Sequence, residues 1–335
     1  MATYYGRKYR LLELRHKFKE AMLSGQTVLK SRCLRRVAGD RPACVAMVDG
    51  MAYHGGMCDR FKGIISLYAY CKHRGIPFGI RYTYPFRLED YLVPASYDWI
   101  LDDSEYTDNP LYSRVLYMRG EHLATRLLNL RMRRRQVHFY TNRDLLERIN
   151  DVLRGENEAD RYDWGELFRE LFRPCEGLRK RIDAIKRNIG GDYCAAVFRF
   201  QNLLGDFHEY RYKELACEDE KEALVVKCLD AVSELKKRHG DKALLVTSDS
   251  AAFLQRVSQI EGVHIIPGKL IHIDQVSGEV DGDTGREVYM KSFLDFYVLS
   301  EAQKIYRIGT SYMYPSEFPV YAAKVNGIPF ESIVI

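Results

Sequence analysis

Short apolar runs alternate along this chain with segments of helical periodicity, and this alternation constrains the fold more than any other feature. Runs with strand character cover 44–48, 77–82, 98–101 and 136–140 in the first half, and 193–200, 243–247, 263–266 and 305–308 in the second. Helical segments separate them, among them 57–71, 144–153, 218–238, 250–259 and 290–302. Strands that alternate with helices form parallel sheets with helices on both faces. We therefore predict an α/β protein with two Rossmann-like parallel sheets.

The length of 335 residues indicates two domains, since one domain usually takes roughly 150 residues. The charged helical stretch 151–190 leads from one half to the other. We predict a first domain over 1–185 and a second domain over 186–335. Ligands of such sheets bind beyond the carboxyl ends of the strands, so polar residues that directly follow a strand are the first candidates for a site.

The composition bears on the cellular location of the protein, on the state of its cysteines and on metal binding. No run of about 18 apolar residues occurs, and the N-terminus lacks the apolar core of a signal peptide, so we expect a cytoplasmic protein. The eight cysteines are scattered without a Cys-x-x-Cys pair, which favours buried thiols over disulfides or a zinc site. The adjacent Asp102 and Asp103 are only a weak sign of a metal, and we predict no metal site.

Positive charge is concentrated in an N-terminal arm, residues 1–36, which holds ten Lys and Arg against two Glu within a chain of net charge +5. Its apolar residues recur at partly helical spacing: Leu11, Leu12, Leu14, Phe18, Met22 and Leu23. Such a helix can contact anionic lipid or an acidic acceptor, although the pattern alone favours a solvated helix packed on the body. Nucleic acid is a weaker alternative, because no aromatic platform or DNA-binding motif accompanies the arm or the basic run 131–135.

The first candidate block follows the run 44–48. Gly55 and Gly56 turn the chain, Met57 and Cys58 follow, and Asp59 lies near the start of the next helix. Paired glycines let the backbone approach a ligand, and a helix N-terminus favours negative charge. A simpler reading is that Asp59 caps the helix.

The second block is Arg199, which emerges from an apolar strand, with Gly205 and Asp206 after it. A buried arginine needs a partner, and a diphosphate matches its guanidinium in a bidentate way. The alternative is a salt bridge to a carboxylate of the core.

Two further blocks lie in the second half. Ser248 and Asp249 end an apolar run, where either can cap the next helix. Asp295 opens a helical segment, and a loop follows the run 305–308. Hydroxyls and free backbone N–H groups in such a loop form a plausible receptor for phosphate. The residues singled out in this loop are Thr310, Ser311, Ser316, Glu317 and Phe318.

Together these blocks resemble the fucosyltransferases that use GDP-fucose, the α1,6- and protein O-fucosyltransferase group that includes the bacterial nodulation enzymes. The likeness rests on Gly-Gly-x-x-Asp-Arg-x-Lys-Gly at 55–63, on Arg199, on the Thr-Ser-Asp turn at 247–249, and on Asp-x-x-x-Leu at 295–299 with the loop after it. Val197 stands where that family often has His. The resemblance implies the GT-B arrangement, in which two Rossmann-like domains face a cleft.

The resemblance also implies a function: inverting transfer of fucose from GDP-fucose to a saccharide acceptor, as in polysaccharide biosynthesis, without a cofactor or a metal. It places Arg199 on the β-phosphate, Asp295 on guanine, and the remaining residues around the nucleotide. These are Gly55, Gly56, Met57, Cys58, Ser248, Asp249, Thr310, Ser311, Ser316 and Phe318. Candidates for the general base are Asp59, Asp206 and Glu317, which we leave unranked. A transferase for another nucleotide sugar, or a non-catalytic binding protein of this fold, is the alternative.

Overall fold

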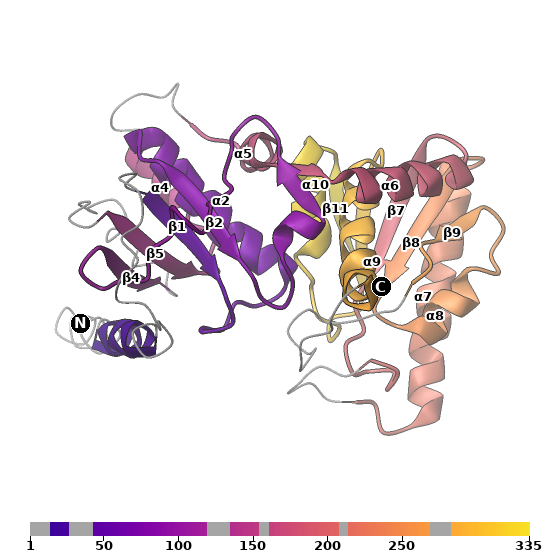
Figure 1. Cartoon of the computed structure of the whole chain (residues 1–335). Helices are drawn as coiled ribbons and strands as arrows, with labels where there is room; N and C mark the ends of the chain where they lie inside the picture. The colour runs from indigo at the N-terminus through magenta and orange to yellow at the C-terminus, as the bar shows by residue number, and fades with distance from the viewer. Residues whose placement is uncertain (1–13, 27–42, 119–134, 154–160, 208–213, 269–282) are drawn as a thin grey trace. The chain divides into compact units, whose positions relative to one another are not determined.

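The computed structural model describes residues 14–26, 43–118, 135–153, 161–207, 214–268 and 283–335. The chain divides into two compact units (Figure 1). The first unit comprises Met1–Leu88 and Pro94–Arg173, and the second comprises Glu89–Val93 and Pro174–Ile335. The expected boundary at residue 185 falls inside helix α6 (Glu176–Ile189), which lies whole in the second unit.

A four-stranded parallel sheet forms the centre of the first unit, with the strand order β2-β1-β5-β4. All residues of β1 are buried, as expected for a strand covered on both faces. The strands are β1 (Ala43–Val48), β2 (Phe78–Tyr82), β4 (Ser113–Met118) and β5 (Gln136–Thr141), and the helices are α2 (Met57–Arg74), α4 (Leu146–Leu153) and α5 (Trp164–Leu171). The chain also forms the 3-10 helix η1 (Leu88–Asp90) and the paired short strands β3 (Leu92–Pro94) and β6 (Phe172–Pro174).

The predicted strand over 98–101 is wrong. Only a single bridge forms there, between Ile100 and Ile80. Trp99 is buried without belonging to a strand, and its indole Nε1 donates a hydrogen bond of 2.7 Å to the carbonyl of Leu171. The fourth strand of the sheet is instead β4, an edge strand in which the exposed Arg114 interrupts the buried residues.

Helix α2 packs on this sheet through an almost continuous run of buried residues from Met57 to Cys71. It ends at Gly75, whose φ of 63° is the left-handed conformation that favours glycine. At Gly63 the helix comes so close to β5 that a Cβ atom would lie 2.1 Å from the carbonyl oxygen of Thr141. Glycine is therefore required at this crossing of helix and strand.

The second unit contains a five-stranded parallel sheet of order β11-β10-β7-β8-β9. The strands are β7 (Tyr193–Phe198), β8 (Ala243–Ser248), β9 (Val263–Ile265), β10 (Ile305–Gly309) and β11 (Phe330–Val334), and the helices after α6 are α7 (Glu218–His239), α8 (Ala251–Val257), α9 (Asp283–Ser300) and α10 (Phe318–Asn326). Side chains of α7 and α8 form one core with alternate residues of β7 and β8. The predicted α/β class with two Rossmann-like parallel sheets is confirmed, whereas a cleft that both sheets face stays a prediction.

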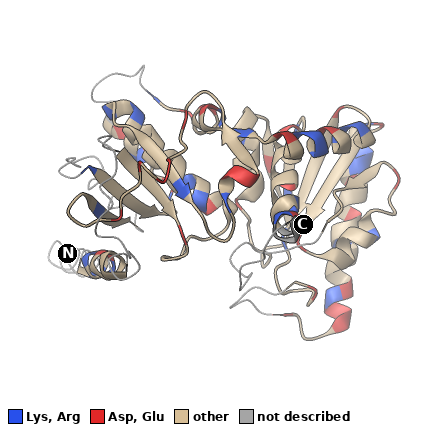
Figure 2. Ribbon diagram, viewed as in Figure 1, with Lys and Arg blue, Asp and Glu red and all other residues tan. Residues whose placement is uncertain are grey.

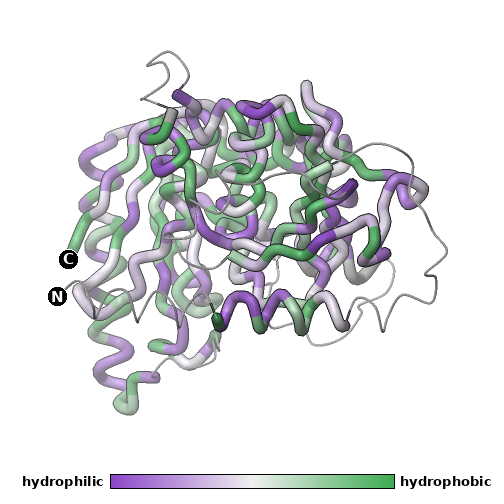
Figure 3. Tube along the Cα trace, turned by 90° about the vertical axis from the view of Figure 1, so that its left-hand side faces the viewer, coloured by the Kyte–Doolittle hydropathy of each residue, from purple (hydrophilic) through white to green (hydrophobic). Residues whose placement is uncertain are grey.

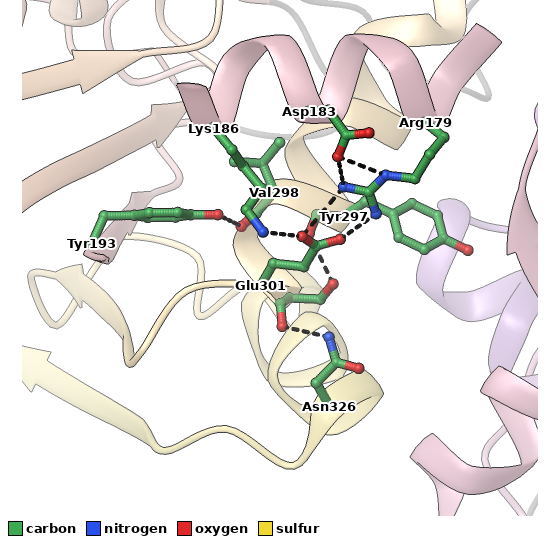
Figure 4. Close-up of polar contacts among 9 residues, drawn as sticks. Arg179, Asp183, Lys186, Tyr193, Tyr297, Val298, Glu301 and Asn326 are labelled. Atoms are coloured by element: carbon green, nitrogen blue, oxygen red, sulfur yellow. Dashed lines mark hydrogen bonds and ion pairs between the residues drawn. The ribbon is translucent and has the colours of Figure 1, made fainter. Parts of the chain in front are cut away.

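An ion-pair network joins α6 to the end of α9 (Figure 4). Glu301 accepts a hydrogen bond of 2.6 Å from Arg179 and another from Lys186. Arg179 also pairs with Asp183, which lies four residues further along α6. Burial acts to raise the pKa of Glu301, but the hydrogen bonds from Arg179 and Lys186 outweigh it and hold the pKa below its ordinary value.

The helices combine hydrophobic with hydrophilic residues, and α7 carries charges at its ends that suit its dipole. Hydrophilic and hydrophobic residues alternate along them (Figure 3). Acidic residues occupy the first turn of α7 and basic residues its last turn (Figure 2), which suits the helix dipole. Among the described helices, none combines the length and the apolar character needed to cross a bilayer.

The described cysteines are all free thiols. Cys44, Cys58, Cys71, Cys194 and Cys228 are buried, Cys175 is half-buried and Cys217 is exposed, while Cys33 lies outside the described residues. The prediction of buried thiols therefore holds for most of them.

Candidate functional site

Three of the blocks singled out in the sequence meet at one edge of the second sheet. Strands β10, β7 and β8 are neighbours and run parallel, so their carboxyl ends lie side by side. Arg199 follows β7, Asp249 follows β8 and Thr310 follows β10. This edge is where ligands of parallel α/β sheets bind.

Asp249 shapes the turn that follows β7. Its Oδ1 accepts a hydrogen bond of 2.8 Å from the backbone N–H of Phe200, and its Oδ2 accepts one of 2.7 Å from Gln201, whose φ is +53°. Burial raises the pKa of this carboxyl, and Arg199 together with the two N–H groups opposes that rise. A buried carboxylate thus fixes the backbone on both sides of the point where the arginine leaves the strand.

Arg199 is held in place by Asp249, with 3.1 Å between Nη1 and Oδ2. Its guanidinium also lies over the ring of Phe207, 5.0 Å from the centroid. The salt bridge to a core carboxylate, which the sequence left open as an alternative, is therefore present. The arginine side chain is still 21% exposed, while the salt bridge fixes its position at the end of β7.

The N-terminus of α8 is capped by the protein itself. Ser250 is the N-cap, and its Oγ accepts from the N–H of Phe253 at 3.1 Å. The sequence had assigned this cap to Ser248 or Asp249, but Ser248 Oγ instead accepts from the N–H of Ser250. Asp206 is brought to the same turn, where its Oδ2 accepts from Ser250 Oγ at 2.8 Å and from the N–H of Ala252 at 2.9 Å.

The loop between β10 and α10 presents hydroxyl groups at the same edge. Thr310 is buried, and within the described part of the chain its Oγ1 has no hydrogen-bond partner. Ser311 is exposed, whereas Ser316 is half-buried and its Oγ accepts from the N–H of Phe318 at 3.3 Å. Glu317 is the N-cap of α10, and its side chain makes no capping bond to the described backbone.

Arg307 fixes this loop and was not singled out in the sequence. Its Nη1 donates to the carbonyls of Pro315 and Ser316, both at 3.2 Å, and its Nε donates to Ser332 Oγ of β11 at 3.2 Å. The sequence feature that could have indicated this role is an arginine inside an otherwise apolar strand. The same feature singles out Arg199.

Asp295 lies in the middle of α9 and not at the start of a helix, because the helix begins at Asp283. Lys291, one turn earlier, donates to both carboxylate oxygens of Asp295 at 2.7 and 2.9 Å. The carboxylate is buried, which raises its pKa, and Lys291 opposes that rise. The next residue, Phe296, packs edge-on against Phe318 at 5.6 Å between ring centroids.

In the first unit, the Gly-Gly block forms the turn that precedes α2. Gly55 has a φ of +75°, and a Cβ atom there would lie 2.5 Å from Oδ2 of Asp59. Gly56 is the N-cap of α2 and has no side chain to cap the helix, while Asp59 is the third residue inside the helix. Met57 and Cys58 form the buried start of the helix. The alternative in which Asp59 caps the helix is therefore wrong.

Two buried cations of α2 support this turn. Arg60 is 1% exposed, and its Nε donates to the carbonyl of Gly55 at 3.0 Å. Its Nη1 donates to Tyr82 Oη at 2.8 Å and to the carbonyl of Tyr84 at 2.7 Å. The second cation, Lys62, pairs with Oδ1 of Asp59 at 2.9 Å. Arg60 thus ties the turn after β1 to the segment after β2.

Asp49 is a carboxylate at the end of β1 that the sequence analysis did not assign to the site. Its Oδ2 accepts from Tyr140 Oη at 2.7 Å. His54 Nε2 lies 3.9 Å from Oδ1 of Asp49, but burial and the nearby Arg60 lower the pKa of His54 to about 3. His54 is therefore neutral, and its Nε2 accepts from the N–H of Gly50 at 3.1 Å.

Metal ligands do not cluster in the parts that the structure describes, where no group of three or more His, Cys, Asp or Glu could hold an ion. Asp103 of the acidic pair is instead bonded to Arg81 at 3.1 Å.

The fold is an α/β architecture shared with solved structures of a fucosyltransferase, NodZ. A crystal structure of NodZ α-1,6-fucosyltransferase soaked with GDP-fucose matches 85% of this chain and 92% of its own, at 14% identity and a TM-score of 0.54. Fucosyltransferase NodZ from Bradyrhizobium matches 84% of this chain and 92% of its own, at 14% identity and a TM-score of 0.52. At such identity the likeness establishes the fold alone.

POFUT1 in complex with GDP also aligns, at 9% identity over 89% of this chain and 100% of its own, but its TM-score of 0.46 is too low to support an argument. No protein-family model matches the chain. A search of curated proteins found no match either.

Proposed function

We propose that this protein is a glycosyltransferase that moves fucose from GDP-fucose to a saccharide acceptor, with inversion at the anomeric carbon. The observation that carries the proposal is Arg199, whose partly exposed side chain is fixed by Asp249 at the carboxyl edge of a parallel sheet. Ligands of such sheets bind at that edge. The fold is shared with a NodZ enzyme whose crystal was soaked with GDP-fucose.

In the proposed reaction, a hydroxyl oxygen of the acceptor bonds to C1 of fucose while the bond from C1 to the β-phosphate oxygen breaks. The electron pair stays on GDP, so the β-phosphate gains negative charge, and the acceptor proton passes to a base. A guanidinium meets a phosphate with two parallel hydrogen bonds, and a fixed cation beside a leaving group stabilises the transition state. Arg199 supplies that cation.

The loop after β10 supports a phosphate site at the same edge. A buried hydroxyl without a hydrogen bond is unfavourable, and a small movement of the loop that uncovers Thr310 Oγ1 would let a phosphate oxygen satisfy it. Ser311 and Ser316 add hydroxyls on the same loop, and Arg307 keeps its backbone in place. In this proposal the reaction requires no cofactor or metal. The protein acts in the cytoplasm, in polysaccharide biosynthesis.

Three carboxylates are candidates for the base. Asp206 is the least available, because one of its oxygens accepts two hydrogen bonds at the start of α8. Asp59 is 41% exposed and paired with Lys62, and Glu317 is exposed. Asp59→Asn and Glu317→Gln separate the two: the variant that lacks the base loses transfer but keeps its affinity for the donor.

One observation favours a second candidate, a transferase for a different nucleotide sugar. Guanine is recognised well by a carboxylate that accepts from its N1 and N2 hydrogens. Both oxygens of Asp295 instead accept from Lys291. Calorimetric titration with GDP-, UDP- and CMP-sugars decides between the candidates, because only the true donor binds tightly. An activity assay with the same sugars checks the result, because only the true donor is hydrolysed or transferred.

The central test is Arg199→Ala, measured as fucose transfer and donor hydrolysis. We expect a loss of about a hundredfold or more, as for removal of a preorganised stabilising group. Arg256→Ala is the matched control, because it removes a surface arginine of the same unit that pairs only at the surface with Glu222. Transfer by the Arg199 variant at the rate of the control would remove this residue from the mechanism.

A further inference from the structure

A helix of the first unit, residues 14–26, packs on the sheet through one face. On that face Leu23 is fully buried in a core with Val115 of β4. The ring of His16 lies 5.6 Å from that of Tyr117, and Glu20 Oε1 accepts from the N–H of Tyr117 at 3.1 Å. The helix is thus anchored on strand β4, and its other face points away from the sheet.

That other face carries a stripe of large apolar side chains. Leu14, Phe18 and Met22 follow one another at intervals of four residues, which places them on one side of a helix. They are 62%, 73% and 37% exposed. Three large apolar groups in line on a solvent-facing helix are an interaction surface, because burying them is favourable.

Cations border the stripe on both sides. At about 100° per residue, Lys17 lies on one flank of the stripe, and Arg15 and Lys19 lie on the other. Arg15 and Lys17 are exposed. The arm to which this helix belongs, residues 1–36, holds ten Lys and Arg against two Glu. An apolar stripe with cations on both flanks is the pattern of a helix that lies in the interface of an anionic bilayer.

We propose that helix 14–26 docks the protein on an anionic lipid surface, with Leu14, Phe18 and Met22 inserted at the boundary between headgroups and acyl chains. Arg15 and Lys17 then lie at the level of the lipid phosphates, where each cation adds to the attraction. The anchoring face keeps its contacts with β4, so docking requires no unfolding of the first unit. The inference is independent of the sugar nucleotide, since it concerns only this helix.

The experiment is co-sedimentation of the full chain with vesicles of phosphatidylcholine alone or mixed with phosphatidylserine. We expect binding only to the mixed vesicles, with weakening as salt is added, because salt screens the attraction. The double variant Phe18→Ser/Met22→Ser should lower the partition constant by about tenfold or more. Arg15→Gln/Lys17→Gln should lower it by about tenfold and reduce its salt dependence. Leu111→Ser is the matched control, since Leu111 is 66% exposed in the same unit but outside the helix.

A Phe18→Trp variant gives an independent readout. Trp99 and Trp164, the two tryptophans of the chain, are both buried, so a change on adding vesicles arises from position 18. A blue shift with the mixed vesicles supports insertion. The inference is overturned if Phe18→Ser/Met22→Ser binds like the control, or if neutral vesicles bind equally well. It is also overturned if sedimentation equilibrium finds a dimer that the double variant dissolves, or if the helix binds RNA in place of vesicles.

Discussion

The substitution Glu301→Gln tests how much the network between α6 and α9 contributes to the second unit. A hydrogen bond to a charged group contributes about 1.5–3 kcal/mol when it is shielded from water. Arg179 and Lys186 are 38% and 36% exposed, so screening reduces each bond to about 1 kcal/mol. Glutamine cannot keep both ion pairs, and the expected loss is about 2 kcal/mol, or roughly 4–8 °C in the melting temperature of a unit of this size.

The loss should depend on pH in a defined direction. The pKa of Glu301 in the folded unit lies below its ordinary value of 4.5. As the pH falls, the unfolded chain therefore takes up the proton first, and folding loses free energy. The stabilisation is complete above the unfolded pKa and is lost as the pH drops through the folded one. The gap between wild type and Glu301→Gln should thus be constant near neutrality and shrink in acid.

Unfolding in urea, followed by two signals, measures this effect. Far-UV circular dichroism reports both units, whereas tryptophan fluorescence reports the first unit, which holds Trp99 and Trp164. Glu287→Gln is the control, because Glu287 also joins α9 to α6 through Arg181, but that pair is 56% and 46% exposed and should contribute only about 0.3 kcal/mol. The reasoning is refuted if both variants lose the same stability, or if the Glu301→Gln deficit persists unchanged in acid.

Three other substitutions probe separate contacts. Asp295→Asn should weaken GDP binding more than UDP binding in calorimetry, and equal effects on the two would reject a guanine contact. Thr310→Val keeps the volume but removes a hydroxyl with no bond to the described protein, so stability should stay level or rise by about 1 kcal/mol while the donor Kd rises about tenfold; an unchanged Kd would exclude the hydroxyl from the phosphate site. Gly63→Ala forces α2 away from the Thr141 carbonyl and should cost about 1–3 kcal/mol in urea unfolding. Gly177→Ala in α6, where a Cβ meets nothing within 4 Å, should be neutral or stabilising, and a similar loss there would contradict the steric argument.

Most strands could be predicted because parallel strands are buried on both faces and read as continuous apolar runs. The two strands of the larger sheets that the pattern does not predict, β4 and β11, are edge strands with exposed residues, so their hydrophobic signal is broken. The three-residue strands β3 and β6 are not predicted either, because a run of that length is too short to show a period. The run around Trp99 was misread because a side chain can be buried by packing and one hydrogen bond without belonging to a sheet.

The location of the site could be predicted from the sequence, but the contacts among its side chains could be predicted less well. Chain order and parallel topology place Arg199, Asp249 and Thr310 at one edge. The contact between Arg199 and Asp249 depends on the register of β7 and β8, in which Phe198 faces Ser248, and no local pattern specifies that register. The pair of Lys291 and Asp295 was readable, because a spacing of four residues places opposite charges on one helical face.

The turn at Gly55 has a consequence for any molecule that binds beside it. Arg60 holds this turn by donating to the carbonyls of Gly55 and Tyr84 and to the hydroxyl of Tyr82. The turn therefore has its final shape before an encounter. Little conformational entropy is left to lose there, so affinity at this turn depends on how well the partner fits and not on ordering the backbone.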